Sequence, residues 1–242
     1  MTLSASSLHL PTRLDAVSVE LNPSQITAIC GPNGAGKSTL MSCLAGLLAP
    51  DRGTVALEGE TLGAIAPQTR AQRIGYLPQE GEVAWDVSVR NLVALGRLPH
   101  RDRGERQVEA ALEAVHLTSF ANRPISTLSG GEKARALLAR VLCGEPDWVL
   151  ADEPLAALDF YHQHEVLSCL HASANQGTGV VLVLHDLALA MNHADRVVVL
   201  KEGRLIADGP PEIALSTDTI IETWGVAARW VGEPGAQALV TA

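Results

Sequence analysis

Residues 31–39 have the residue types and the spacing of a loop that binds a chain of phosphates. They fit the pattern GxxxxGK[ST] between a predicted strand and a predicted helix. The glycines let successive backbone N–H groups turn toward an anion, and the following helix adds its positive end. Lys37 supplies a charge for the β- and γ-phosphates, and the Ser38 hydroxyl can ligate Mg²⁺. We therefore predict a nucleoside-triphosphate site formed by Gly31, Pro32, Asn33, Gly34, Ala35, Gly36, Lys37, Ser38 and Thr39.

An acidic pair, Asp152 and Glu153, follows the apolar run at residues 148–151. Alone, such a pair at the end of a strand would usually lie in a solvated turn. Together with the phosphate loop, it predicts the second half of a hydrolytic site. We expect Asp152 to hold Mg²⁺ through water and Glu153 to polarise the water that attacks the γ-phosphate.

The segment LSGGE at residues 128–132 predicts a second phosphate-binding surface. Ser129 is a good N-cap for a following helix. Gly130 and Gly131 leave backbone N–H groups uncovered beside the positive end of that helix. One nucleotide needs only one such cradle, so the second cradle is expected to serve another subunit.

Short apolar runs that alternate with helical patterns predict an α/β fold with a parallel sheet. We expect Leu40, Leu44, Leu47 and Leu48 to share one face of a helix that ends at the turn residues 50–53. A helix-rich stretch is predicted over residues 89–144, with a break near 123–124. The expected strands lie at residues 26–30, 55–57, 74–77, 148–151 and 180–184, with a closing hairpin over 197–207.

The net charge and the apolar runs of the chain disfavour some classes of binding partner. The chain has 242 residues, and its 18 Lys and Arg against 27 Asp and Glu give a net charge of −9. Such an acidic chain is a poor candidate for binding nucleic acid. No apolar run approaches the roughly 20 residues of a membrane span, and the first residues do not resemble a secretory signal. Four cysteines without a CxxC pair predict small buried side chains in a reducing cytosol: Cys30, Cys43, Cys143 and Cys169.

The order of these motifs resembles that of the ATP-binding subunits of ABC transporters, whose signature is LSGGQ or LSGGE. Gln79 matches the family's Q-loop, which implies contact with Mg²⁺ and the attacking water. Asp159, in the D-loop match at residues 154–159, is implied to face a partner subunit. His185 matches the switch histidine that contacts the γ-phosphate. The resemblance implies the cofactors ATP and Mg²⁺ and a head-to-tail homodimer that holds two ATP molecules.

The same resemblance implies a P-loop NTPase core with a mostly parallel sheet, an N-terminal antiparallel β portion and an inserted helical subdomain. The core is expected at residues 1–79 and 146–210, the insert at about 80–145, and an appendage, helical by its weak pattern, at 211–242. One departure concerns adenine, which the family usually stacks on an aromatic residue upstream of the phosphate loop. Residues 1–30 contain no Phe, Tyr or Trp. Relaxed base selectivity is therefore expected, with either His9, Leu10 or Pro11 as a substitute contact or an adenine that is held only loosely.

Two further segments resemble importer ATPases for iron–siderophore complexes, haem and cobalamin: residues 85–100, which end in LGRLPH, and residues 222–226. This implies the energising subunit of a binding-protein-dependent importer. Its partners would be a permease dimer and a periplasmic or extracellular binding protein, and it would lie at the cytoplasmic face of the inner membrane. Alternatives are another class of ABC transporter, a non-transport ABC ATPase and, less well supported, a P-loop kinase. His162 and His164 are expected on a solvated surface rather than at a metal.

Overall fold

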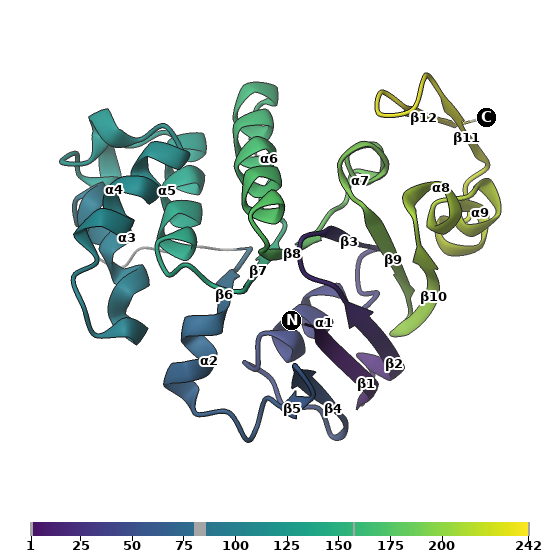
Figure 1. Ribbon diagram of the computed structural model, residues 1–242. Coiled ribbons are helices and arrows are strands. Elements are labelled where there is room, and N and C mark those ends of the chain that lie inside the picture. Colours follow the sequence, from purple (N-terminus) through teal and green to yellow (C-terminus); the bar gives the residue numbers. More distant parts are fainter. Residues whose placement is uncertain (1, 80–85, 157, 242) are drawn as a thin grey trace.

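The computed structural model describes residues 2–79, 86–156 and 158–241, so Ala157 and residues 80–85, with which the predicted insert begins and which include Trp85, lie outside the described residues. Figure 1 shows two sheets, a group of helices to one side and a C-terminal segment at the opposite side. The strands are β1 (Leu3–Leu10), β2 (Leu14–Leu21), β3 (Ile26–Cys30), β4 (Arg52–Leu57), β5 (Glu60–Thr61), β6 (Ile74–Leu77), β7 (Trp148–Asp152), β8 (Gly179–Val183), β9 (Arg196–Lys201), β10 (Arg204–Gly209), β11 (Ala228–Val231) and β12 (Ala238–Thr241). The helices are α1 (Lys37–Leu44), α2 (Pro67–Arg73), α3 (Val89–Ala94), α4 (Glu105–Ala114), α5 (Gly130–Leu142), α6 (Phe160–Asn175), α7 (Leu187–His193), α8 (Pro211–Ala214) and α9 (Thr217–Trp224), with 3₁₀ turns η1 (Leu95–His100), η2 (Thr118–Phe120) and η3 (Ile125–Thr127).

The larger sheet has the strand order β10-β9-β3-β8-β7-β6. All its neighbouring strands are parallel except β9 and β10, which form the predicted hairpin. Glu202 and Gly203 both have positive φ at the turn of that hairpin, as a type I′ turn requires. The predicted parallel sheet is confirmed, and the strand predicted at 180–184 begins and ends one residue earlier.

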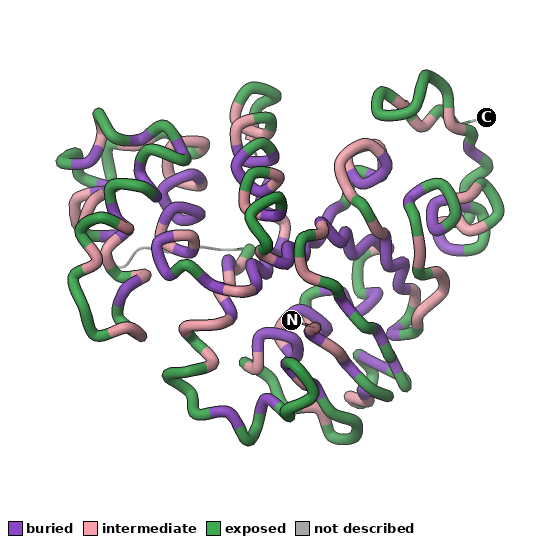
Figure 2. The backbone as a smooth tube through the Cα atoms, in the orientation of Figure 1, coloured by how far each residue is buried: buried purple, intermediate pink, exposed green. Residues whose placement is uncertain are grey.

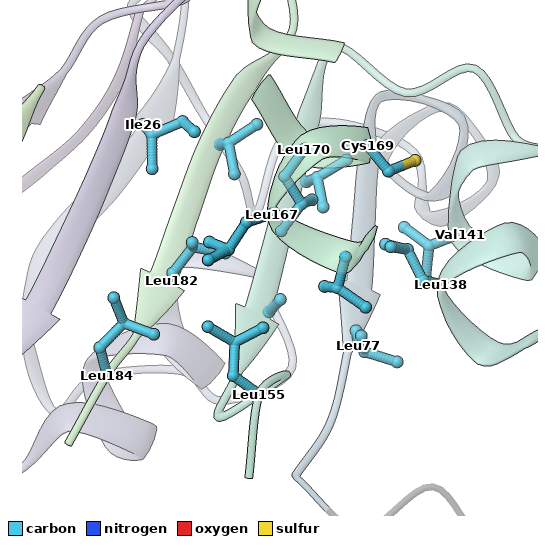
Figure 3. Packing of buried hydrophobic residues seen from close by; sticks show 14 of the residues in the cluster. Ile26, Leu77, Leu138, Val141, Leu155, Leu167, Cys169, Leu170, Leu182 and Leu184 are labelled. Carbon is cyan, nitrogen blue, oxygen red and sulfur yellow. The ribbon is translucent and has the colours of Figure 1, made fainter. Parts of the chain in front are cut away.

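Helices and a second sheet cover opposite faces of this parallel sheet. Every residue of β3, β7 and β8 is buried (Figure 2), which explains why these strands are almost entirely apolar, with Thr27 and Asp152 as the exceptions. Alternate residues point to two separate buried clusters, since successive side chains of a strand face opposite ways. Leu182 and Ile26 pack with Leu167 and Leu170 of α6 on one face (Figure 3).

The opposite face carries α1 and the second sheet, whose order is β2-β1-β4-β5 and whose pairs are all antiparallel. Leu40 and Leu44 of α1 join the buried cluster there, beside Leu150 and Val183 of the parallel sheet. The predicted combination of a mostly parallel sheet with an antiparallel N-terminal portion is therefore confirmed.

Helix α1 is shorter than predicted. It ends at Leu44, and Gly46 adopts a φ of 68° directly after it. The backbone N–H of Leu47 then bonds back to the carbonyl of Ser42 at 2.9 Å, which closes the helix in a glycine-dependent cap. Leu47 and Leu48 lie beyond the helix and are 65% and 37% exposed, so their predicted place on one helical face with Leu40 and Leu44 is wrong.

The stretch between β6 and β7 contains α3, α4 and α5, and Figure 1 shows them gathered to one side of the sheets. It is broken more often than predicted, because Arg101, Gly104 and His116 take positive φ where the chain turns between helices. The buried cluster of the sheet continues into these helices through Leu138 of α5. The division into a core and an insert stays a prediction.

The C-terminal segment contains α8 and α9, and then the antiparallel pair β11–β12, which the weak sequence pattern did not indicate. The side-chain N–H of Trp230 in β11 donates to the carbonyl of Leu215 at 2.8 Å and fastens the strand pair to the α8 region. Across the described ranges, no helix combines the length and the hydropathy needed to cross a bilayer.

Candidate nucleotide-hydrolysis site

The phosphate loop joins β3 to α1, and two of its glycines are required by close backbone contacts. A Cβ on Gly31 would lie 2.2 Å from the carbonyl oxygen of Leu200 in β9. A Cβ on Gly36 would lie 2.6 Å from the carbonyl oxygen of Arg13, and Gly36 also has a φ of 99°. The loop is thus held between β9 and the turn that follows β1, in a conformation that other residues cannot adopt without strain.

Lys37 is buried inside this loop at the first position of α1. Its Nζ donates to the carbonyl oxygens of Gly31 at 2.8 Å and Pro32 at 3.1 Å. Burial lowers the pKa of Lys37, and the nearby Glu153, Cys30 and Asp152 oppose that shift. A buried cation with neutral partners is well suited to bind an anionic phosphate chain.

Asp152, the last residue of β7, has the environment of a cation ligand. The residue is buried, and its Oδ1 has no hydrogen-bond partner among the described residues. Burial raises the pKa of this carboxyl, Ser38 lowers it by a hydrogen bond, and the neighbouring Glu153 raises it. A free carboxylate oxygen beside a hydroxyl is a donor set that suits Mg²⁺, so these residues fit the metal that the sequence predicts.

Gln79, Glu153 and His185 meet although they come from three separate strand ends. The side-chain N–H of Gln79 donates to Glu153 Oε2 at 2.8 Å, and His185 Nε2 lies 2.5 Å from Glu153 Oε1. Glu153 takes a φ of 53°, a left-handed conformation that L-residues adopt at a cost. This turn aims its carboxylate between the other two side chains. The hydrogen bond from Gln79 uses its amide nitrogen, so its amide oxygen is available as a ligand.

A cavity of about 560 Å³ brings these elements together. Most of its wall consists of residues from the predicted motifs, whereas Arg13 lies in the turn after β1 and belongs to no motif. Asp152 does not line the cavity but is buried near Ser38, which does, and Ser38 lowers the pKa of this carboxyl. The cavity is lined by Arg13, Asn33, Gly34, Ala35, Gly36, Lys37, Ser38, Thr39, Gln79, Glu153 and His185.

A second group of predicted residues lies outside this cavity: Ser129, Gly130, Gly131 and Asp159. Gly31 and Pro32 do not line the cavity either, but their carbonyl oxygens accept from the Nζ of Lys37. Ser129 caps α5 as predicted, in a reciprocal capping box with Glu132. Gly130 has open space where a Cβ would be, whereas at Gly131 a Cβ would lie 2.6 Å from the ring of His162.

The Nδ1 atom of His162 also lies 2.7 Å from the carboxylate of Asp159. His162 therefore connects the predicted second phosphate-binding surface at Gly131 with Asp159, which is predicted to face a partner subunit. The side chain of His162 is 21% exposed, so it is only partly solvated, while His164 is exposed as predicted. Among the described residues no cluster of three or more His, Cys, Asp or Glu side chains could hold a metal. All four cysteines are free and buried, as predicted.

Comparison with known proteins gives the same family by two routes. The sequence model described as ABC transporter matches residues 14–156. The chain is 42% identical to the hemin import ATP-binding protein HmuV of Rhodococcus jostii, over 91% of this chain and 77% of that protein. It is 44% identical to the HmuV protein of Nocardia farcinica, over 87% and 75% respectively.

Solved structures that resemble this chain also come from ABC transporters. A chain of a metal-chelate type ABC transporter in an inward-facing conformation superposes with a TM-score of 0.86 at 26% identity, covering 100% of this chain and 97% of that one. The cbiO1 protein of Clostridium perfringens, part of the ABC transporter complex cbiONQ, gives a TM-score of 0.79 at 27% identity, covering 91% and 92%. The chain therefore belongs to the ABC transporter family, in which it is an importer-type ATP-binding subunit with ATPase activity.

Proposed function

We propose that the chain hydrolyses Mg·ATP to drive the import of haem through a membrane permease. The observation that carries the hydrolytic part is the convergence of Gln79, Glu153 and His185 on one side of the cavity that Lys37 and Ser38 line. A base, an amide and an imidazole beside a phosphate loop are the groups that position and activate water against a γ-phosphate.

Each of these groups has a distinct proposed role. Glu153 accepts the proton of the attacking water, and its two carboxylate oxygens are oriented by Gln79 and His185. His185 contacts the γ-phosphate, and Lys37 exchanges its two carbonyl partners for phosphate oxygens. Asp152, Ser38 and Gln79 would hold Mg²⁺, which neutralises charge on the phosphate oxygens when bound.

A homodimer explains why Ser129, Gly130, Gly131 and Asp159 lie outside the cavity. We assign these residues to the nucleotide of a second, head-to-tail copy of the chain. The uncovered backbone of Gly130 at the start of α5 supports this assignment, because N–H groups at a helix start bind phosphate.

The permease would dock where apolar side chains remain exposed around η1. Leu95 is 42% and Leu98 69% exposed, and both border a hollow of about 320 Å³ that Tyr76 and Pro99 also line. The motif LGRLPH makes this surface rigid: Arg97 is buried and binds the Asp102 carboxylate by two hydrogen bonds of 2.9 and 2.7 Å. Attachment to the permease places the chain at the cytoplasmic face of the inner membrane.

The choice of haem rests on the relatives that are named hemin import proteins. The test is reconstitution of the chain with its permease in liposomes, with the binding protein added outside in the haem, ferric siderophore or cobalamin form. Haem-loaded binding protein should stimulate ATP hydrolysis and uptake more than the others. Equal or greater stimulation by a siderophore or cobalamin would contradict the proposed cargo but leave the ATPase assignment intact.

A further inference from the structure

Arg13 is fixed by its backbone at the wall of the nucleotide cavity. Its carbonyl oxygen lies between two glycines, 2.6 Å from a Cβ built on Gly36 and 2.7 Å from one built on Gly203. Its N–H donates to the carbonyl of Leu10 at 3.0 Å. The N–H of Asp15 donates to Gly203 at 2.8 Å and ties the same turn to the β9–β10 hairpin. The position of the Arg13 side chain relative to the phosphate loop is therefore set by contacts that its substitution leaves unchanged.

The guanidinium of Arg13 is available to a ligand. Arg13 is exposed and lines the cavity, and within the described ranges its side chain makes no hydrogen bond or ion pair. The nearest acidic residue along the chain, Asp15, is already paired with Arg204 at 2.7 Å and lies 3.7 Å from His9.

The phosphate end of the cavity already has its own binding groups. Lys37, Ser38 and the backbone of the loop serve the phosphates, and Gln79, Glu153 and His185 are joined by hydrogen bonds in which Arg13 takes no part. If those three residues lie beside the γ-phosphate, the nucleoside must lie at another edge of the cavity. Among the described residues no Phe, Tyr or Trp lines the cavity, so this part of the chain offers the nucleoside no aromatic ring to stack on.

We propose that the planar guanidinium of Arg13 stacks on the face of the nucleotide base and so supplies the base contact of this site. Guanidinium planes stack on π-systems, unlike the compact ammonium of lysine. Stacking reads the face of a base rather than its hydrogen-bonding edge, so this contact distinguishes poorly between bases. The inference rests on the proposed nucleotide site, and it makes GTP nearly as good a substrate as ATP.

Substitution at Arg13 separates a base contact from a phosphate contact. The purified full-length chain is compared with the variants Arg13→Ala, Arg13→Lys and Arg13→Tyr, and with Arg103→Ala as an exposed arginine that does not line the cavity. Dissociation constants are measured for ATP, GTP and inorganic tripolyphosphate in the presence of Mg²⁺. Thermal unfolding of each variant shows that it is folded.

We expect Arg13→Ala to weaken ATP and GTP binding about 5- to 150-fold, the range found when aromatic side chains that stack on bases are removed. Tripolyphosphate should bind as it does to the unaltered chain. The nucleotide affinity should be restored in Arg13→Tyr and not in Arg13→Lys, because stacking requires a planar side chain rather than a positive charge. The proposal is overturned if Arg13→Ala has no effect, if tripolyphosphate loses affinity in parallel with ATP, or if lysine restores binding and tyrosine does not.

The nucleotide site itself is tested separately by Lys37→Ala, which should abolish binding of ATP and tripolyphosphate alike. Retention of both by Lys37→Ala would contradict the proposed site, whatever the Arg13 variants show.

Discussion

Replacing Glu153 with glutamine removes the basic group of the site while keeping its shape. The carboxylate accepts from Gln79 at 2.8 Å and lies 2.5 Å from His185 Nε2. A glutamine carbonyl can accept from Gln79, and its amide can donate to the neutral imidazole. Loss of a general base slows a reaction by about 10²- to 10⁴-fold, which corresponds to about 3–5 kcal/mol of transition-state stabilisation. We expect Glu153→Gln to lose hydrolysis by this factor and to keep ATP affinity.

The assay measures phosphate release, ATP binding and molar mass in solution with and without Mg·ATP. Because bound ATP is no longer consumed, an ATP-loaded dimer should accumulate in Glu153→Gln. Glu60→Gln is the control, since it removes the same charge from an exposed strand that does not line the cavity. Hydrolysis by Glu153→Gln at nearly the wild-type rate would refute the role of this carboxylate.

Three further changes test other parts of the structure. Gly131→Ala should destabilise the chain by about 1–3 kcal/mol, because its Cβ would lie 2.6 Å from the His162 ring, and His162→Ala in the same chain should recover most of this loss. Gly179→Ala should lower the melting temperature by about 2–10 °C, because its Cβ would lie 2.4 Å from the buried ring of Trp148. Asp152→Asn should raise the melting temperature of the nucleotide-free chain at neutral pH and abolish stabilisation by Mg²⁺ with ATP. Burial raises the pKa of Asp152 above 3.8. The stability that the protonated carboxyl contributes is therefore lost as the pH rises through the folded-state pKa. Asparagine cannot ionise, so the variant does not lose this stability.

All three are measured by thermal unfolding. Gly209→Ala is the control for the glycine variants, because a Cβ there meets nothing within 4 Å and its φ is not positive. Additive effects of Gly131→Ala and His162→Ala would contradict the contact between them. A melting temperature of Asp152→Asn that falls with pH as steeply as that of the unaltered chain would contradict the assignment of the pH dependence to Asp152.

Much of the fold follows from local sequence because the central strands are buried on both faces. Runs such as Ile26–Cys30, in which Thr27 is the one polar residue, are short and almost wholly apolar, so they indicate buried strands. The sequence pattern does not mark the end of α1, because two leucines, Leu47 and Leu48, continue the helical spacing past Leu44, while the stop depends on a single glycine, Gly46. The strand pair β11–β12 has mostly exposed residues, so no periodic apolar pattern marks it.

The sequence likewise predicts some residues of the site and not others. Lys37, Asp152 and Glu153 belong to short motifs, which sequence alone reveals. Arg13 and His162 were missed or misplaced, since their importance depends on contacts with Gly36 and Gly131. Such contacts arise only when segments distant in sequence are packed together.

The pairing of β3 has a consequence for how the chain is made. This strand lies between β8 and β9, and the loop after it is held by Gly203, whose N–H donates to the carbonyl of Ala35 at 3.1 Å. Ribosomes add about 5–20 residues per second, so β3 is made on the order of ten seconds before its neighbours. During that interval an apolar strand has no partner and the phosphate loop has no fixed shape. A nascent chain therefore needs protection from aggregation over most of its synthesis, and it can first hold a nucleotide only after the β9–β10 hairpin has left the ribosome.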